Sequence, residues 1–287
     1  MAKLIMMKGL PASGKSTSVK QMLQDNGNWV RVNKDLLREM LHFNKWTGNN
    51  EKLTMKAEKE LAKFFLKQNI NVMVDDTNLG ESHKDIWKNI ATETKAVFGI
   101  LEKGTSVEEC IERELERKKV GTHVIYKMAL QYSKLEKPEL GFVICDIDGT
   151  VANCEHRLHY VNGETKDWKG FFSEMMNDSP IESTISLIEE YQDKGHKIIF
   201  VSARSEDYRK ETIEWLASKI PSIKYLTLIM RGSHDKRPDT EVKQQIFDLY
   251  FKDKYDIEVI VDDRPSVIRM WKQNNLNVID VGKGEEF

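Results

Sequence analysis

The sequence is poor in the residues that brace small extracellular proteins. It holds three cysteines and six prolines in 287 residues, and Cys110, Cys145 and Cys154 lack the number and spacing of a disulfide framework or a zinc site. No apolar run approaches the roughly 18 residues that cross a bilayer. The start, MAKLIMMKGL, lacks the apolar core and cleavage site of a signal peptide. We therefore expect no membrane association and a reducing, cytosol-like compartment.

An excess of one charge is also absent. The formal net charge is −2, which excludes the strongly basic surface of a protein that coats duplex nucleic acid. The two halves differ, since residues 1–140 hold 24 Lys and Arg against 19 Asp and Glu, and residues 141–287 hold 20 against 27. A mildly basic first half is compatible with a nucleic-acid strand, but ordinary variation between domains explains it equally well.

Short apolar runs alternate with amphipathic stretches along the whole chain. This pattern is typical of parallel sheets covered by helices, and the length suffices for two domains. We predict an α/β fold with two domains, each a parallel sheet flanked by helices, at residues 1–139 and 140–287, because the polar stretch 134–141 is broken by Pro138. The predicted strands are 4–7, 29–32, 72–74, 97–101, 142–145, 197–201, 225–229, 258–261 and 277–281, and the predicted helices include 16–23, 52–67, 107–119 and 180–194.

The first motif is GLPASGKS at residues 9–16, which fits the P-loop pattern G-x-x-x-x-G-K-[ST] between an apolar strand and a helical stretch. Its glycines let backbone N–H groups face phosphate oxygens, and the new helix presents its positive end to the same anion. Lys15 can neutralise the β- and γ-phosphates of ATP, and the Ser16 hydroxyl can ligate Mg²⁺. The predicted donor-binding residues of this loop are Gly9, Ser13, Gly14, Lys15, Ser16 and Thr17.

Two further groups in the first half are less specific. Asp35 follows a predicted strand and could take a proton from an attacking hydroxyl, while Arg38, one helical turn on, could hold an acceptor phosphate. A capped helix start with a solvated arginine explains the same pattern. After strand 72–74, the carboxylates of Asp75 and Asp76 suit an Mg²⁺ shell or positioning of the acceptor, although a turn of Asx-type residues is the alternative.

Arg113 and Arg117 are four residues apart, so both guanidinium groups lie on one helix face. Such a pair could close over a nucleotide and offset charge in the transition state. The same helix is rich in glutamates, and a salt-bridged surface helix fits the bare pattern better.

The second half carries its own chemistry in DIDGT, residues 146–150. Asp146 follows a buried strand and can attack a phosphate ester to form an acyl phosphate, while Asp148 can protonate the leaving oxygen and later activate water. Carboxylate and phosphate repel each other, so a cation is required. Ser202, Lys243 and the pair Asp262-Asp263 follow in that order along the chain. The order D-x-D-G-T, Ser, Lys, D-D resembles the haloacid dehalogenase superfamily of phosphatases.

That resemblance implies that Ser202 and Lys243 bind the phosphoryl group. It places Mg²⁺ among Asp146, Asp148, Asp262 and Asp263. Arg204 could read a substrate phosphate or form a structural ion pair, and Arg157 lies in the segment expected to cover the site. His156 and His159 lack metal-ligand partners at suitable spacing, so an ordinary loop is favoured there. Cys145 reads as a buried strand residue.

A P-loop kinase followed by this phosphatase resembles the polynucleotide kinase–phosphatases of bacteriophages, over nearly the whole sequence and in the same domain order. The resemblance implies phosphorylation of a 5′-OH with ATP and Mg²⁺, and removal of a 3′-phosphate, on nucleic-acid ends that a ligase then joins. It further implies homotetramers and, for a phage-encoded protein, the host cytoplasm. Residues 39–71 and 151–180 differ from the phage prototype, so strand type and length preference stay open.

The resemblance also assigns roles to individual residues. It makes Asp35 the base toward the 5′-OH, Arg38 a contact of the acceptor phosphate, and Arg117, with Arg113, a contact of the donor phosphates. It favours substrate contacts for Asp76, Arg157, Arg204 and Asp239.

Two other functions fit parts of the sequence. A small-metabolite kinase and phosphatase would accept a free nucleoside or sugar, and a non-catalytic module would lose a reacting group, although Lys15, Asp35 and Asp146 are all present.

Overall fold

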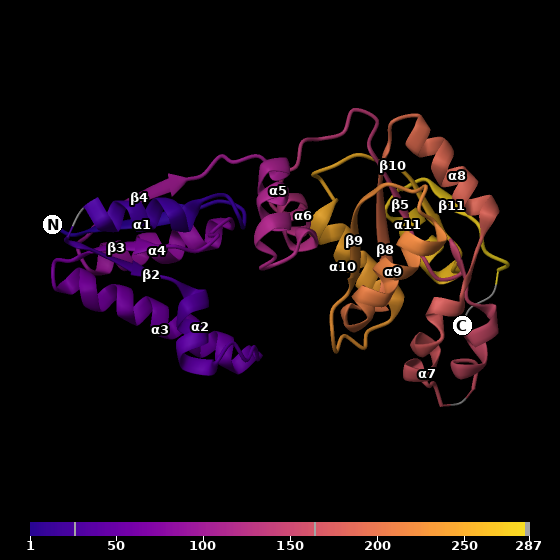
Figure 1. The fold of residues 1–287 in the computed structure, drawn as a ribbon, viewed down its shortest axis with the longest axis horizontal. Helices are drawn as coiled ribbons and strands as arrows, with labels where there is room; N and C mark the ends of the chain where they lie inside the picture. Colours follow the sequence, from indigo (N-terminus) through magenta and orange to yellow (C-terminus); the bar gives the residue numbers. More distant parts are fainter. Residues whose placement is uncertain (26, 164, 285–287) are drawn as a thin grey trace. The chain divides into compact units, whose positions relative to one another are not determined.

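The computed structural model describes residues 1–25, 27–163 and 165–284. The chain forms two compact units, residues 1–132 and 133 onward, which we describe separately (Figure 1). The units divide between Tyr132 and Ser133, shortly before the expected boundary at 139/140. In the described part of the chain, no helix has both the length and the apolar character of a membrane span.

The first unit contains a parallel four-stranded sheet in the order β2-β3-β1-β4. Leu4 of β1 is in register with Val72 of β3 on one side and with Phe98 of β4 on the other. The strands are β1 (Lys3–Lys8), β2 (Trp29–Val32), β3 (Asn71–Val74) and β4 (Val97–Glu102), and the helices are α1 (Lys15–Asp25), α2 (Lys34–His42), α3 (Gly48–Lys67), α4 (Glu81–Glu93), α5 (Val107–Arg117) and α6 (Thr122–Gln131).

Alternation along the strands gives this sheet two apolar faces. Leu4 and Met6 of β1 pack with Ala62 of α3 and Trp87 of α4. Met7, the next residue of β1, packs on the opposite face with Val19 of α1. The sheet is thus buried on both sides, which leaves its strand ends as the place for polar side chains.

The second unit contains a parallel five-stranded sheet in the order β11-β10-β5-β8-β9. Its central strand β5 (Phe142–Cys145) is buried throughout, and Cys145 is in register with Phe200 and Val261. The other strands are β8 (Lys197–Ser205), β9 (Tyr225–Arg231), β10 (Ile257–Asp262) and β11 (Val278–Asp280), with a two-stranded antiparallel ribbon of β6 (Ala152–Asn153) and β7 (Ser179–Pro180).

Helices cover both faces of this second sheet. Val143 packs with Ile188 of α8 and Trp215 of α9, and on the other face the ring of Phe142 meets Phe251, just past α10. The helices are α7 (Trp168–Ser173), α8 (Glu182–Asp193), α9 (Arg209–Lys219), α10 (Asp239–Tyr250) and α11 (Pro265–Gln273), with 3-10 turns η1 (Glu155–Tyr160), η2 (Met175–Asn177) and η3 (Glu206–Tyr208).

The predicted fold class is confirmed, with differences at element ends. Strand β8 runs on to Ser205, so Ser202 lies inside the strand and not at its end. Helix α5 stops at Arg117 because Lys118 adopts a left-handed backbone with φ 49°. Helix α3 begins at Gly48, earlier than its apolar pattern suggests, because the Thr47 side chain caps the backbone N–H of Asn50.

Candidate active sites

The P-loop connects β1 to α1 at the carboxyl edge of the first sheet. Gly9 has φ 152°, and an added Cβ there would lie 2.8 Å from Ser13 Oγ, so glycine is required for the close approach. Helix α1 begins at Lys15 and directs its N-terminus at the loop. The Lys15 ammonium donates to the carbonyls of Gly9 at 3.0 Å and Leu10 at 2.7 Å. Burial lowers the pKa of Lys15 to about 8.

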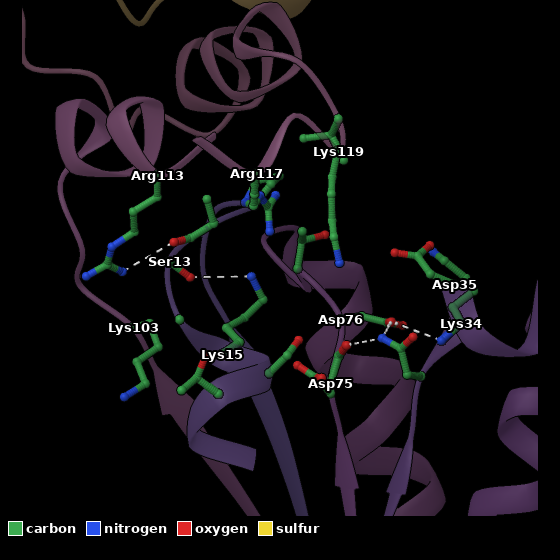
Figure 2. A pocket seen from close by; sticks show the side chains of 18 of the residues that line it. Ser13, Lys15, Lys34, Asp35, Asp75, Asp76, Lys103, Arg113, Arg117 and Lys119 are labelled. Atoms are coloured by element: carbon green, nitrogen blue, oxygen red, sulfur yellow. Dashed lines mark hydrogen bonds between the residues drawn. The ribbon is translucent and has the colours of Figure 1, made fainter. Parts of the chain in front are cut away.

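A cavity of about 970 Å³ opens over this loop. In Figure 2, Lys15 and Ser13 lie on one side of the cavity, Asp75 and Asp76 at its floor, and Asp35 at its far edge. Its polar lining combines the P-loop with the ends of β2 and β3 and with α5, which is the edge where parallel sheets bind ligands. The lining residues include Ser13, Gly14, Lys15, Ser16, Thr17, Lys34, Asp35, Arg38, Asp76, Lys103, Arg113, Arg117 and Lys119.

Asp35 and Arg38 lie together at the start of α2, but not as free groups. The Asp35 side chain is 78% exposed and its Oδ1 accepts from Arg38 Nη1 at 2.7 Å. The guanidinium also donates from Nε and Nη2 to the two oxygens of Glu51, at 2.9 and 3.1 Å. The Arg38 guanidinium, which we expected to bind an acceptor phosphate, is therefore paired with Glu51. The sequence pattern gave no indication of this glutamate.

The two carboxylates after β3 have different partners. Asp75 is buried, and its Oδ2 accepts from Arg31 Nε at 2.8 Å and Nη2 at 2.6 Å. Asp76 Oδ1 accepts from the backbone N–H of Lys34 at 3.1 Å and from Asn33 Nδ2 at 3.3 Å. Asp76 thus fixes the first turn of α2.

Glu58 of α3 lies buried beside Asp76, in a small cavity that His83 also lines. Burial, and then the charge of Asp76, raises the pKa of Glu58 to about 9. Burial likewise lowers the pKa of His83 below its ordinary value. The raised pKa favours the neutral, protonated form of Glu58 at pH 7, beside the carboxylate of Asp76.

The loop after α5 is held from inside by the buried carboxylate of Glu114. Its Oε1 accepts from the backbone N–H groups of Lys119 at 2.7 Å, Val120 at 2.5 Å and Gly121 at 2.8 Å, and its Oε2 pairs with Arg117 Nε. With the backbone fixed in this way, the Lys119 side chain reaches into the cavity (Figure 2). The carboxylate of Glu114 therefore positions both Arg117 and Lys119 at the cavity over the P-loop.

Arg113, one turn before Arg117, lies over the P-loop itself. Its Nη1 donates to the carbonyl of Ala12 at 3.3 Å, and its Nη2 pairs with Glu109. Arg113 and Arg117 line the cavity, and each is also salt-bridged to a glutamate of its own helix. Their contact with a bound nucleotide stays a prediction.

In the second unit, the carboxyl edge of the sheet gathers four charged side chains. Lys243 of α10 is buried, and its ammonium lies 3.0 Å from Asp146 Oδ2 and 2.8 Å from Asp262 Oδ2. One oxygen each from Asp146, Asp262 and Asp263 falls within 4.8 Å of the others. Three buried carboxylates so close together form an oxygen-ligand set that suits Mg²⁺.

The electrostatics of this group call for additional positive charge. Burial and the neighbouring aspartates raise the pKa of Asp146 well above its usual range, although Lys243 opposes the shift. Burial and Asp262 raise the pKa of Asp263 to about 6. Lys243 itself is disfavoured as a cation by burial, but Asp146 and Asp262 more than offset this and raise its pKa. One lysine does not balance three carboxylates, so the donor set fits a divalent ion.

Gly149 is what lets the loop after β5 close on the carboxylates. It has φ 77°, and an added Cβ would lie 2.0 Å from Asp263 Oδ2. Thr150, next along the chain, donates from Oγ1 to Asp263 Oδ1 at 3.0 Å. The G-T part of DIDGT thus positions Asp263 across the site.

Asp148 does not join the metal-ligating carboxylates, although the sequence analysis counted it among them. Its carboxylate accepts from Arg204 Nε at 2.9 Å and Nη2 at 2.7 Å, and pairs with Arg157 Nη2. Burial would raise the pKa of Asp148, but Arg204 and Arg157 hold it well below its usual range.

Asp178 is a second carboxylate that binds both Arg157 and Arg204, and no sequence pattern pointed to it. It is fully buried and accepts from Arg157 Nε at 2.8 Å, Arg157 Nη2 at 2.6 Å and Arg204 Nη2 at 3.3 Å. His156 Nε2 lies 2.9 Å from the same carboxylate, so this histidine belongs to an ion-pair network and not to a metal site.

Two other predicted residues fall at the same edge. Ser202 is buried and its Oγ accepts from the backbone N–H of Arg204 at 3.2 Å. Asp239, at the start of α10, pairs with Arg231 and Arg264. Asp239 therefore positions two arginines and does not itself face solvent as a free carboxylate.

Residues 141–286, slightly more than half of the chain, match the family profile described as the polynucleotide kinase PNKP phosphatase domain. The chain belongs to this PNKP family. In the first half of the PNKP-family chain, residues 4–134 match an AAA domain family, in agreement with the P-loop and its parallel sheet.

Individual proteins are similar to this PNKP-family chain at moderate identity. It is 28% identical, over 94% of its length, to a protein provisionally named bifunctional polynucleotide kinase/RNA ligase of Autographa californica nuclear polyhedrosis virus, and spans 41% of that protein. An L-seryl-tRNA(Sec) kinase of Methanococcus maripaludis is 26% identical over 65% of the chain, which spans 76% of that kinase. A chain solved in a Pnkp1/Rnl/Hen1 RNA repair complex is 28% identical, with a TM-score of 0.43 and coverage of 99% of this chain and 97% of that one.

Proposed function

We propose that the chain is a bifunctional enzyme for nucleic-acid ends, which transfers the γ-phosphate of ATP to a 5′-OH and removes a 3′-phosphate. The observation that carries the proposal is the separation of two complete constellations. A P-loop cavity with an aspartate at its edge belongs to one sheet, and a carboxylate–lysine group belongs to the other. Membership in the PNKP family supports the second activity and the polynucleotide substrate.

In the kinase unit, the triphosphate would lie on the backbone N–H groups of Ser13 to Thr17 at the start of α1, with Lys15 turned from the loop carbonyls toward the phosphates. Ser16 would hold Mg²⁺, whose charge would offset that of the phosphates. Arg113 and Arg117 offset negative charge on the transferred group. Asp35 accepts the proton of the 5′-OH from the exposed edge of the cavity.

In the phosphatase unit, Asp146 attacks phosphorus, the ester P–O bond breaks, and an aspartyl phosphate forms that water then hydrolyses. Mg²⁺ among Asp146, Asp262 and Asp263 would neutralise the repulsion between carboxylate and phosphate. The ammonium of Lys243 holds the Asp146 carboxylate in position. The same ammonium would bind the oxygens of the phosphoryl group that Asp146 attacks.

Asp148 must carry a proton to act as the acid, yet two arginines hold it ionised. If Arg157 and Arg204 turn to the substrate phosphate, Asp148 loses both counter-charges and its pKa rises. Substrate binding would in this way prepare the acid, and return of the arginines would restore the carboxylate that activates water. Ser202 completes the phosphate pocket beside Arg204.

Both product ends, a 5′-phosphate and a 3′-hydroxyl, are those that a ligase joins. The name of the baculoviral relative combines a polynucleotide kinase with an RNA ligase. This supports an RNA ligase as the next enzyme to act on these ends. The chain would then prepare broken RNA for sealing.

A single substrate tests the two activities together. We expect wild type to phosphorylate the 5′ end and remove the 3′-phosphate of an oligonucleotide that carries 5′-OH and 3′-phosphate, with ATP and Mg²⁺. Lys15→Ala should abolish 5′ labelling and spare 3′ release, because only the P-loop is altered, and Asp146→Asn should do the reverse. End-labelling and phosphate release, measured on the same samples, check this.

Free nucleosides and sugars serve as the control acceptors in that experiment. Efficient phosphorylation of a nucleoside with no response to the oligonucleotide would contradict the polynucleotide assignment. Loss of both activities in each folded variant would contradict the separation into two sites.

A further inference from the structure

The solvent-facing side of α2 and its C-cap carry large apolar side chains that lie outside the hydrophobic core of the first unit. Leu36 and Met40 are spaced at i and i+4, which places them on one face of α2, and Phe43 follows as the C-cap residue just past the helix end. Their exposed fractions rise along the helix, from 50% to 68% to 92%. The opposite face is served by Leu37, which is buried in the core of the first unit.

The loop that follows adds a second exposed aromatic ring and a cation. Trp46 is 69% exposed, and Lys45 beside it is exposed as well. Among the described residues, neither Phe43 nor Trp46 is found stacked on another ring. We call Leu36, Met40, Phe43 and Trp46 the α2 platform. Four exposed large apolar side chains within one short segment point to a binding surface.

The α2 platform is continuous with the kinase cavity. Leu36 lines the cavity beside Asp35, and Figure 2 shows Asp35 and Lys34 at the edge away from Arg113 and Lys103. Phe43, the C-cap of α2, comes seven positions after Leu36, which corresponds to about 10 Å along the helix axis at 1.5 Å per residue. The platform therefore extends outward from the side where the 5′-OH must enter.

The charge of this segment suits an anionic chain. Residues 34–59 contain six Lys and Arg against four Asp and Glu, and burial raises the pKa of one of the four, Glu58, to about 9. Exposed rings that alternate with cations, here Phe43, Lys45 and Trp46, are the combination by which proteins hold single strands, since bases stack on the rings and cations follow the backbone.

We propose that the α2 platform binds the unpaired nucleotides next to the 5′-OH, with bases on Phe43 and Trp46 and a backbone phosphate at Lys45. This inference rests on the proposed kinase function and adds the form of the substrate. The enzyme prefers a 5′ end with several unpaired nucleotides over a dinucleotide or a recessed end, because only unstacked bases can lie on the rings.

The test compares a 12-nucleotide single strand with a dinucleotide, both with 5′-OH and 3′-OH ends so that the phosphatase does not interfere. In the double variant Phe43→Ala/Trp46→Ala, KM for the 12-mer should rise at least about tenfold. The kcat, the KM for ATP and the KM for the dinucleotide should stay as in wild type. Phe64→Ala, which removes another exposed ring of the same unit, is the matched control and should change nothing.

Binding without turnover gives a second readout. Tryptophan fluorescence should fall when the 12-mer is added without ATP, and Trp46→Phe should lose that change while keeping the wild-type KM, because phenylalanine still stacks. Lys45→Ala should lower the slope of log K against log salt by about 0.7.

Several outcomes would overturn the inference. Equal loss with dinucleotide and 12-mer would make the rings structural, and an unchanged KM for the 12-mer would remove the platform from binding. If the double variant dissociated an oligomer in sedimentation with KM unchanged, the face would be an interface between copies. Wild type that phosphorylates no oligonucleotide would instead refute the proposed function itself.

Discussion

At the scale of single residues, both sites keep their charged groups paired with partners that lie elsewhere in the sequence. Asp148 is held by Arg157 and Arg204, and Arg38 is held by Glu51. Such pairs fix side chains in place without the entropy cost of ordering them during the reaction. In the proposed mechanism a substrate phosphate would replace the Asp148 carboxylate as the partner of these arginines, which would link binding to proton transfer in the second unit.

Asp35 offers a direct test of the proton acceptor. Asp35→Asn removes the base, and we expect transfer to fall by roughly 10²–10⁴-fold. ATP affinity should be unchanged, because Asp35 lies at the cavity edge and makes no contact with the P-loop lysine in the described structure. Single-turnover transfer and nucleotide titration measure the two effects, and undiminished transfer would remove Asp35 from the mechanism.

Glu58 gives a pH-dependent prediction. The unfolded chain ionises Glu58 near its ordinary pKa of 4.5, whereas the folded chain keeps the proton up to about pH 9. Between these values unfolding releases a proton, so this residue makes stability fall as pH rises, by up to about 1.4 kcal/mol per pH unit.

Glu58→Gln keeps the shape and the donor but cannot ionise. Relative to wild type it should be equally stable at pH 4 and more stable by a few kcal/mol at pH 9. Urea unfolding at pH 4, 7 and 9 measures this. The exposed Glu60 of the same helix, changed to Gln, is the control. A flat difference for Glu58→Gln would show that the residue is ionised in the folded chain.

At the scale of elements, the reacting groups lie at strand ends and the groups that aim them lie on helices and loops. Sequence could predict the first kind, because a buried strand followed by Asp146, or a glycine-rich loop before Lys15, has a local pattern. It could not predict Asp178, Glu51 or Glu58, since their contacts join segments that are far apart in the chain. It also placed Asp148 with the metal ligands, because spacing alone does not show which neighbour a side chain meets.

The loop after α5 is an element whose shape depends on one side chain. Glu114→Ala would leave the N–H groups of residues 119–121 without their acceptor and free Arg117. We expect a loss of about 3 kcal/mol or more in stability of the first unit and at least a tenfold fall in 5′ phosphorylation. The 3′-phosphatase activity should be unaffected.

The exposed Glu112 of the same helix, changed to Ala, is the matched control for that measurement. Protease sensitivity of the loop should increase in Glu114→Ala and stay constant in the control. Wild-type kinase rates in the Glu114 variant would show that Arg117 is positioned by other contacts.

At the scale of the whole molecule, each unit has its own sheet and its own core. We therefore expect two transitions in calorimetry. ATP with Mg²⁺ at about 100 times its Kd should stabilise the first unit by about 2.7 kcal/mol and raise its transition by roughly 10 °C. The transition of the second unit should not move, and Lys15→Ala should abolish the shift. One transition that moves as a whole would indicate that the units unfold together.

The connection between α2 and α3 contributes nothing to either apolar face of its sheet. Loops of this sort accept insertions and replacements at little thermodynamic expense, because closure entropy grows only slowly with length. Natural variants can therefore alter residues 43–46, which precede the Thr47 cap of α3, without changing the P-loop or the aspartates of the two sites. The preference of such enzymes for particular nucleic-acid ends could then diverge rapidly between lineages, while the reacting residues stay the same.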